Sequence, residues 1–243
     1  MQTSEWFKDW FNSPYYHILY KHRDENEAAQ FIDKLSEHLH LNKSNLIWDL
    51  ACGKGRHSLY LNKKGYNVVG TDLAAQNINW IAEQSNERLE FYIHDMRAPF
   101  RVNYFSHVLN LFTSIGYFEN EKDNSKVFKT VYNSLQPGGI FVIDFFNSNR
   151  VLKNVGSSYE VEIEKIGFKI FKTLIDKKII KRIEVIDAKE KIFFEEKVSL
   201  LTKEDFMKFS VNAGFKLLET FGDYDLNAFE KENSKRLILI FRK

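Results

Sequence analysis

The sequence predicts an α/β fold in which a mostly parallel sheet, covered by helices on both faces, is interrupted late in the chain by a smaller antiparallel sheet. Between residues 46 and 145, short apolar runs typical of buried strands alternate with stretches of helical spacing. Between residues 159 and 200, strand-like runs follow one another with no helix between them, as the strands of an antiparallel sheet do.

The composition is that of an ordinary globular protein. Its 243 residues, 44% hydrophobic and 28% charged, suffice for one α/β domain with a core of its own. The formal net charge is only +2, with acids and bases mixed, so we expect no nucleic-acid partner. No run approaches the roughly 20 apolar residues of a membrane span, so we expect no membrane partner.

The histidines and the single cysteine exclude two further classes of protein. The seven histidines lack the spacing of metal ligands, so we expect no metal site. Cys52 stands alone and cannot form an internal disulfide, which favours a cytoplasmic protein.

The first 40 residues are predicted to form an aromatic lid followed by a helix. Aromatic side chains crowd the start of the chain at Trp6, Phe7, Trp10, Phe11, Tyr15, Tyr16 and Tyr20. Behind them Ala28, Phe31, Leu35 and Leu39 recur at helical spacing, which predicts an amphipathic helix over residues 25–40.

The parallel sheet is predicted from alternating strands and helices. The strands are expected at 46–51, 66–71, 89–94, 106–112 and 140–145, and the helices at 57–64, 74–84 and around 127–135. Gly65 stops the first of these helices, and Pro137-Gly138-Gly139 stops the last.

After Asn149 the pattern changes. Residues 159–164 alternate with period two, and further strands are expected at 168–175, 179–186 and 191–200. A helix over 204–213, with Thr202 as its cap and Gly214 as its stop, precedes closing strands at 215–221 and 236–242. We therefore expect a single domain, 1–243, with the lid and helix in 1–40 and an antiparallel insertion in 151–200.

Polar residues stand where three of the predicted strands end. Gly53 and Gly55 follow the first strand and let backbone amides approach a ligand closely. Asp72 ends the second strand, where a carboxylate can bind both hydroxyls of a ribose. Asp95 ends the third, and Met96 beside it offers a polarisable face to a purine ring. This order of residues predicts a nucleotide-type site at the carboxyl edge of the sheet.

The segment Asp49-Leu-Ala-Cys-Gly-Lys-Gly55 resembles the first motif of class I S-adenosylmethionine (SAM)-dependent methyltransferases. Ala51 stands where a glycine is usual in that family, so we expect its φ to stay negative. Asp72 matches the family's ribose acid, and Asp95-Met96 the pair beside the adenine. The resemblance covers roughly residues 15–150 and 200–243 and implies a Rossmann-like seven-stranded sheet whose last strand is antiparallel.

A narrower resemblance is to small-molecule methyltransferases, including sugar amine N-methyltransferases. It rests on Asp95-Met-Arg97, on Phe112-Thr-Ser-Ile-Gly-Tyr117 and on an N-terminal Tyr16-x-x-x-Tyr20-x-x-Arg23. In such proteins that N-terminal segment folds over the cofactor, and Arg23 would hold the methionine carboxylate.

The resemblance implies SAM as cofactor and a set of residues around it. That set is Tyr16, Tyr20, Arg23, Asp49, Ala51, Gly53, Gly55, His57, Asp72, Leu73, Asp95, Met96, Leu111 and Phe112. Methyl transfer itself needs alignment and exclusion of water more than a base. If the acceptor is protonated and a base is needed, the candidates at the pocket mouth are Tyr117, His94 and Asp144. Tyr117 is the first of them, as a hydroxyl that positions the acceptor just past the fourth strand.

The expected function is methyl transfer to a nitrogen or oxygen of a small molecule by a monomer or homodimer. The insertion could cap the site or form a subunit interface. Two alternatives remain. A non-catalytic SAM-binding module would keep the same pocket. An NAD-dependent oxidoreductase would share the strand, turn and acid, but Ser58 stands where its third glycine is expected.

Overall fold

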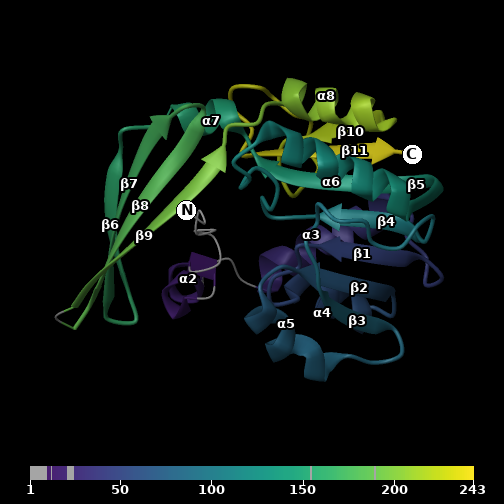
Figure 1. The fold of residues 1–243 in the computed structure, drawn as a ribbon, viewed down its shortest axis with the longest axis horizontal. Coiled ribbons are helices and arrows are strands. Elements are labelled where there is room, and N and C mark those ends of the chain that lie inside the picture. The colour runs from purple at the N-terminus through teal and green to yellow at the C-terminus, as the bar shows by residue number, and fades with distance from the viewer. Residues whose placement is uncertain (1–9, 12, 21–24, 154, 189) are drawn as a thin grey trace.

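The computed structural model describes residues 10–11, 13–20, 25–153, 155–188 and 190–243, which form two separate sheets (Figure 1). The larger has seven strands in the order β10-β11-β5-β4-β1-β2-β3. Their bounds are β1 Leu46–Leu50, β2 Asn67–Asp72, β3 Leu89–Ile93, β4 Phe105–Asn110, β5 Leu135–Phe146, β10 Lys216–Phe221 and β11 Arg236–Arg242. β11 pairs antiparallel with both β5 and β10, while the other neighbours pair in parallel. The predicted mostly parallel sheet with an antiparallel last strand is confirmed.

Helices cover the larger sheet on both faces. They are α3 Glu25–His38, α4 Arg56–Lys63, α5 Ala75–Ile81, α6 Glu121–Ser134 and α8 Lys203–Ala213, with short α2 Pro14–Leu19, η1 Ala82–Gln84 and α7 Ser148–Leu152. Helices α6 and α8 pack through Phe128 and Phe206 on one face, and α3 and α4 through Phe31 and Leu61 on the other. From Leu237 to Phe241 of β11, successive side chains alternate between these two cores, so this middle part of the strand is apolar throughout.

The predicted helix over 204–213 forms as α8. Thr202 and Asp205 make a reciprocal capping box, in which each side chain accepts the other's backbone N–H. Gly214 ends the helix with φ of +104°.

The smaller sheet is the predicted insertion. It consists of β6 Ser158–Ile163, β7 Ile166–Ile175, β8 Lys178–Asp187 and β9 Glu190–Ser199, all antiparallel. One of its faces packs on residues 10–11 and 13–20, called the N-terminal segment below. There Trp10 and Leu19 contact Phe168 and Ile183 in a shared core. Helix α2 consequently lies between this sheet and the α/β body (Figure 1).

The start of the fifth strand differs from its prediction. We expected Pro137-Gly138-Gly139 to form a turn before the fifth strand, but β5 already begins at Leu135. Leu135 pairs with Phe105 of β4, and the register then shifts before Ile140 pairs with His107. The glycines therefore form an irregularity within the strand. Among the helices that the structure describes, none is long and apolar enough to cross a membrane.

Candidate functional site

The turn after β1 is built from left-handed backbone. Ala51, Gly53 and Gly55 have φ of +62°, +58° and +73°. A Cβ on Gly55 would lie 3.1 Å from Ile81 Cδ1 and 3.2 Å from the Phe91 ring, so any side chain there would press on both.

The negative φ expected at Ala51 is wrong. The chain reverses directly after Leu50, and the N–H of Cys52 donates to Thr71 O at 2.9 Å, which ties the turn to β2. Ala51 is thereby held in a region that its Cβ makes unfavourable by roughly 1 kcal/mol.

Asp72, the last residue of β2, joins this turn to the second strand end. Its Oδ2 accepts the N–H of Gly53 and its Oδ1 that of Ala74, both at 2.8 Å. Burial raises the pKa of the Asp72 carboxyl, and the two amides oppose that change. Because each carboxylate oxygen can accept a further hydrogen bond, Asp72 can still receive hydroxyl groups from a ligand.

Asp49 lies beneath the turn. It is 2% exposed, and its Oδ2 accepts the hydroxyl of Ser58, on the first turn of α4, at 2.5 Å. Burial raises the pKa of Asp49 to about 6. Ser58 stands where a dinucleotide site would have its third glycine, and a Cβ on the facing Gly70 would come within 3.0 Å of the Ser58 hydroxyl. Asp49 thus supports α4 from below.

A smaller pocket of about 220 Å³ opens above this turn. Eight of the predicted cofactor residues line it: Tyr16, Ala51, Gly53, His57, Asp72, Leu73, Leu111 and Phe112. Tyr117 also lines it, together with residues that were not predicted, namely Phe11, Cys52, Arg56, Asn77, Thr113, Ser114 and Phe118. Asp49 and Gly55 support this pocket without lining it, and Arg23 lies outside the described residues.

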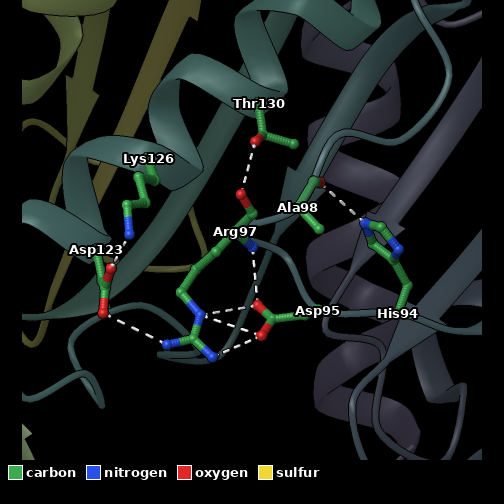
Figure 2. A network of polar contacts seen from close by, with 7 residues as sticks. All are labelled: His94, Asp95, Arg97, Ala98, Asp123, Lys126 and Thr130. Atoms are coloured by element: carbon green, nitrogen blue, oxygen red, sulfur yellow. Dashed lines mark hydrogen bonds and ion pairs between the residues drawn. The ribbon is translucent and has the colours of Figure 1, made fainter.

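Asp95 and Met96 do not line the smaller pocket. Figure 2 shows the Asp95 carboxylate turned to the Arg97 guanidinium, whose Nε lies 3.0 Å from Oδ1 and Nη2 2.6 Å from Oδ2. Burial opposes ionisation of Asp95, but the hydrogen bonds from Arg97 lower its pKa on balance. Arg97 lies over the ring of Phe118, a pocket residue, while Met96 packs against the core. Contact of Asp95 and Met96 with adenine stays a prediction.

A larger pocket of about 630 Å³ lies between the α/β body and the inserted sheet. The N-terminal segment contributes Leu19 and Tyr20, the inserted sheet Lys181 and Glu196, and the start of β11 Arg236. The two pockets share five lining residues: Phe11, Tyr16, Phe112, Thr113 and Tyr117. Tyr20, predicted at the cofactor, lines the larger pocket and not the smaller one.

A cluster of polar groups holds the N-terminal segment on the inserted sheet. Glu196 of β9 accepts the indole N–H of Trp10 at 2.6 Å and the hydroxyl of Tyr20 at 2.8 Å. Lys181 of β8 lies 3.5 Å from the other Glu196 oxygen and also donates to Tyr20. These side chains are mostly buried, so the pocket wall rests on charge-assisted hydrogen bonds.

Two titratable side chains of the smaller pocket, His57 and Cys52, are kept uncharged by burial. Burial lowers the pKa of His57 to about 3, so its ring carries no charge at neutral pH. Burial raises the pKa of the Cys52 thiol well above its usual range, which makes Cys52 a poor nucleophile. Within the described ranges, no group of three or more His, Cys, Asp or Glu residues could hold a metal ion.

Of the three candidates for acting on the acceptor, only Tyr117 lies at the pockets. Its ring meets that of Phe11 edge-on, with 5.4 Å between centroids. His94 lines neither pocket, and its Nε2 lies 3.1 Å from Ala98 O. Asp144 is 0% exposed and is bonded to Arg236, so our suggestion of Asp144 as a base at the pocket mouth is wrong.

The sequence interpretation missed Thr113, Lys181, Glu196 and Arg236. A signal existed for Arg236, because the antiparallel last strand must begin at the edge where parallel strands end. The sequence did not indicate a role for Lys181 and Glu196, because residues 159–200 contain many other Lys and Glu residues in predicted strands.

Part of the chain matches a known protein family. Residues 48–143 match the family described as the methyltransferase domain. The matched range contains the glycine turn, Asp72 and the segment Phe112–Thr113, which lines both pockets and is called the divider below.

Several curated proteins resemble parts of the chain. YqeM of Bacillus subtilis (strain 168) is 31% identical over 114 residues, which are 46% of each protein. A glycine/sarcosine N-methyltransferase of Halorhodospira halochloris is 24% identical over 83% of this chain and 75% of its own. The dTDP-3-amino-3,4,6-trideoxy-alpha-D-glucopyranose N,N-dimethyltransferase of Streptomyces venezuelae is 28% identical over 53% of this chain and 54% of its own. The chain thus spans about half the length of the first curated relative.

Solved structures share the whole fold. A SAM-dependent methyltransferase from Clostridium acetobutylicum ATCC 824 superposes with a TM-score of 0.79 at 19% identity, covering 94% of this chain and 95% of that one. CalS10, an amino pentose methyltransferase from Micromonospora echinaspora, superposes with a TM-score of 0.72 at 18% identity, covering 95% and 97%. Over at least nine tenths of the chain, the fold is therefore that of solved SAM-dependent methyltransferases.

Proposed function

We propose that this protein transfers a methyl group from SAM to a nitrogen or oxygen of a small-molecule acceptor. The observation that carries the proposal is the meeting of the two pockets at Phe11, Tyr16, Phe112, Thr113 and Tyr117. A donor in the smaller pocket and an acceptor in the larger one would face each other across these residues.

The residues of the smaller pocket fit SAM. The Asp72 carboxylate, already fixed by two backbone amides, would accept the ribose hydroxyls. Neutral His57 adds no positive charge beside a cationic sulfonium. SAM supplies a methyl group that its sulfonium charge has already activated. We keep Asp95 and Met96 as the proposed adenine side, and Arg23 as the proposed partner of the methionine carboxylate.

The chain's own contribution would be alignment and exclusion of water. The aromatic residues at the junction shield the line between donor and acceptor. Holding two reactants in line can lower a barrier by as much as roughly 7–11 kcal/mol. Tyr117, which lines both pockets, is the residue we propose to position the acceptor atom.

The larger pocket favours a small acceptor. Its walls come from the N-terminal segment and the inserted sheet, which would block a folded protein or a duplex. The names of a glycine/sarcosine N-methyltransferase, a sugar N,N-dimethyltransferase and an amino pentose methyltransferase among the similar proteins support this size of acceptor. The lone, buried Cys52 is compatible with the cytoplasm, which we propose as the compartment.

Calorimetric titration with SAM and with NADH tests the donor. We expect SAM to bind and NADH not to bind; the reverse preference would refute the proposal. A mass-spectrometric screen with SAM carrying a labelled methyl group then tests transfer to a metabolite pool. Tight SAM binding with no labelled product from a broad pool would favour the non-catalytic module.

A further inference from the structure

Phe112 and Thr113, the divider, adopt a backbone that neither residue type favours. Their φ values are +70° and +64°, in the left-handed region that side chains with a Cβ rarely adopt. Both residues line both pockets. A segment held in such a conformation needs surroundings that over-determine it, and such segments cluster at functional sites.

Asp144 supplies much of that support from beneath. Its Oδ2 accepts the N–H of Phe112 at 2.9 Å, and its backbone oxygen accepts the N–H of Thr113 at 2.9 Å. Both amides of the divider are therefore bonded to one residue of β5. Because Asp144 is fully buried in the central sheet, its position is fixed by the core.

Arg236 completes the support from the neighbouring strand. Its Nε donates to Asp144 Oδ1 at 2.7 Å, and its Nη2 donates to the hydroxyl of Thr113 at 3.2 Å. Arg236 is 18% exposed and lines the larger pocket. Since β11 is antiparallel to β5, its first residue lies at the edge where β4 and β5 end, which places the guanidinium beside the divider.

Tyr224 and Arg56 hold the ring of Phe112. Tyr224 donates its hydroxyl to Asp144 Oδ2 at 3.1 Å and stacks on Phe112 with 6.2 Å between centroids and 27° between planes. Arg56, from the start of α4, lies over the same ring at 4.6 Å. The Phe112 side chain is thus fixed by residues from the donor side and from the closing part of the chain.

We infer that Asp144, Arg236 and Tyr224 form a positioning unit that holds the divider in its left-handed conformation and so shapes the donor pocket. The inference rests on the proposed function, because it names SAM as the ligand whose binding depends on the unit. None of the three needs to touch the reacting atoms.

Two measurements test the inference separately from the proposed function. The first is hydrogen–deuterium exchange, without ligand, in peptides covering residues 110–116. Asp144→Asn replaces one carboxylate oxygen by an N–H₂ group, which cannot accept from the Phe112 N–H, the Tyr224 hydroxyl or Arg236 Nε. We therefore expect the backbone amides of the divider to exchange at least tenfold faster. Arg236→Lys keeps the charge but loses the guanidinium group that donates to both Asp144 and Thr113, so it should accelerate exchange by a smaller factor. This variant replaces Asp144→Asn as the test if Asp144→Asn does not fold.

The second measurement is the Kd for SAM by calorimetry. We expect it to rise at least tenfold in Asp144→Asn and by a smaller factor in Arg236→Lys. Tyr224→Phe keeps the stacked ring and should raise it less than threefold. Asp33→Asn is a matched control, because Asp33 also joins a tyrosine and a cation, Tyr60 and Lys64, away from both pockets. It should change neither measurement.

Each outcome decides one question. Unchanged exchange at the divider would overturn the anchoring role. Faster exchange with an unchanged Kd for SAM would overturn the link to the donor pocket. If the variants show the expected exchange differences from the wild type, but the wild type does not bind SAM, the proposed function is refuted and the anchoring role is still supported.

Discussion

The two pockets are built in different ways. The smaller pocket is formed mainly by consecutive strand ends of one sheet, and its polar contacts run from side chain to backbone, as from Asp72 to Gly53 and Ala74. The larger pocket joins the N-terminal segment, the inserted sheet and the start of β11, and is held by contacts between side chains, such as Glu196 with Trp10.

This difference bears on what each pocket can recognise. A pocket made of strand ends and backbone amides keeps its shape whenever the sheet forms, which suits a fixed cofactor. A pocket assembled from side chains of remote segments can change its ligand by substitution at a few positions. We therefore expect the donor side to be the more tolerant of changes in the inserted sheet.

Substitution of Asp72 tests this difference between the pockets most strongly, because we expect it to change the Kd for SAM more than any other substitution. Asp72→Ala removes the proposed ribose acceptor and both hydrogen bonds that this side chain accepts from the backbone N–H groups of Gly53 and Ala74. We expect the Kd for SAM, measured by calorimetry, to rise at least about 100-fold, since hydrogen bonds to a charged group contribute roughly 1.5–3 kcal/mol each.

Asp223→Ala is the matched control for this change. Asp223 likewise accepts two backbone N–H groups, from Asp225 at 3.0 Å and Asn227 at 3.1 Å, but it lines neither pocket. It should leave the Kd for SAM unchanged. Equal SAM affinity in Asp72→Ala and the wild type would mean that the smaller pocket is not the donor site.

A pH-dependent effect should appear at Asp49. Burial raises its folded-state pKa from 3.8 to about 6, so the folded protein binds this proton more tightly than the unfolded chain does. The free energy of unfolding therefore falls, through this group, as the pH rises from about 4 to about 6. Asp49→Asn removes this pH dependence. The free energy of unfolding of the variant, relative to that of the wild type, should therefore increase by about 2–3 kcal/mol between pH 4 and pH 7.

Urea unfolding at both pH values measures this difference. The control, Asp33→Asn, should show the opposite sign, because hydrogen bonding to Lys64 lowers the pKa of Asp33. Relative to wild type it should become less stable as the pH rises through the unfolded-state pKa. Parallel curves for Asp49→Asn and wild type would contradict the burial of an ionisable Asp49 beneath the turn.

The fold and the residues that line the smaller pocket were largely predictable from the sequence. Apolar strands such as β11 alternate between two cores, and this produces a visible pattern. Gly53 and Asp72 act through a turn and a strand end, which are local features. The error at Ala51 arose because hydrogen bonding of Cys52 to β2, a tertiary contact, overrides the local preference for negative φ.

The larger pocket was not predictable in the same way. Lys181 and Glu196 pair across β8 and β9, and only that register shows which Lys and Glu face the pocket. Arg236 reaches Thr113 across 123 positions of the chain. The place of Arg236 at the sheet edge follows from the antiparallel last strand, but its contact with Thr113 and the pairing of Lys181 with Glu196 depend on how separate segments of the chain pack.

A smaller effect sharpens the comparison at the larger pocket. Glu196→Gln replaces charge-assisted hydrogen bonds to Trp10 and Tyr20 by neutral ones, so the N-terminal segment should open more often. We expect chymotrypsin to cleave within residues 10–20 about tenfold faster, which corresponds to a loss of about 1.4 kcal/mol. Glu195→Gln, on the outer face of the same strand and paired with Lys197, should not change the rate.

The Kd for SAM should rise less than threefold in Glu196→Gln, because a segment that stays mostly closed still presents Phe11 and Tyr16 to the donor. A loss of SAM affinity as large as that of Asp72→Ala would erase the distinction between the two pockets.

The smallest effect is expected where the donor turn carries its own strain. Ala51→Gly removes the Cβ at φ of +62°, and we expect the free energy of unfolding to increase by about 1 kcal/mol, or roughly 2–4 °C in Tm. Calorimetry measures the change, with Ala213→Gly, at the last residue of α8, as a control that should instead lose stability because it removes a buried methyl group. A lower Tm for Ala51→Gly would mean that the Ala51 methyl group contributes packing that outweighs its strain. Either result leaves the larger pocket untouched, because Ala51 lines only the smaller one.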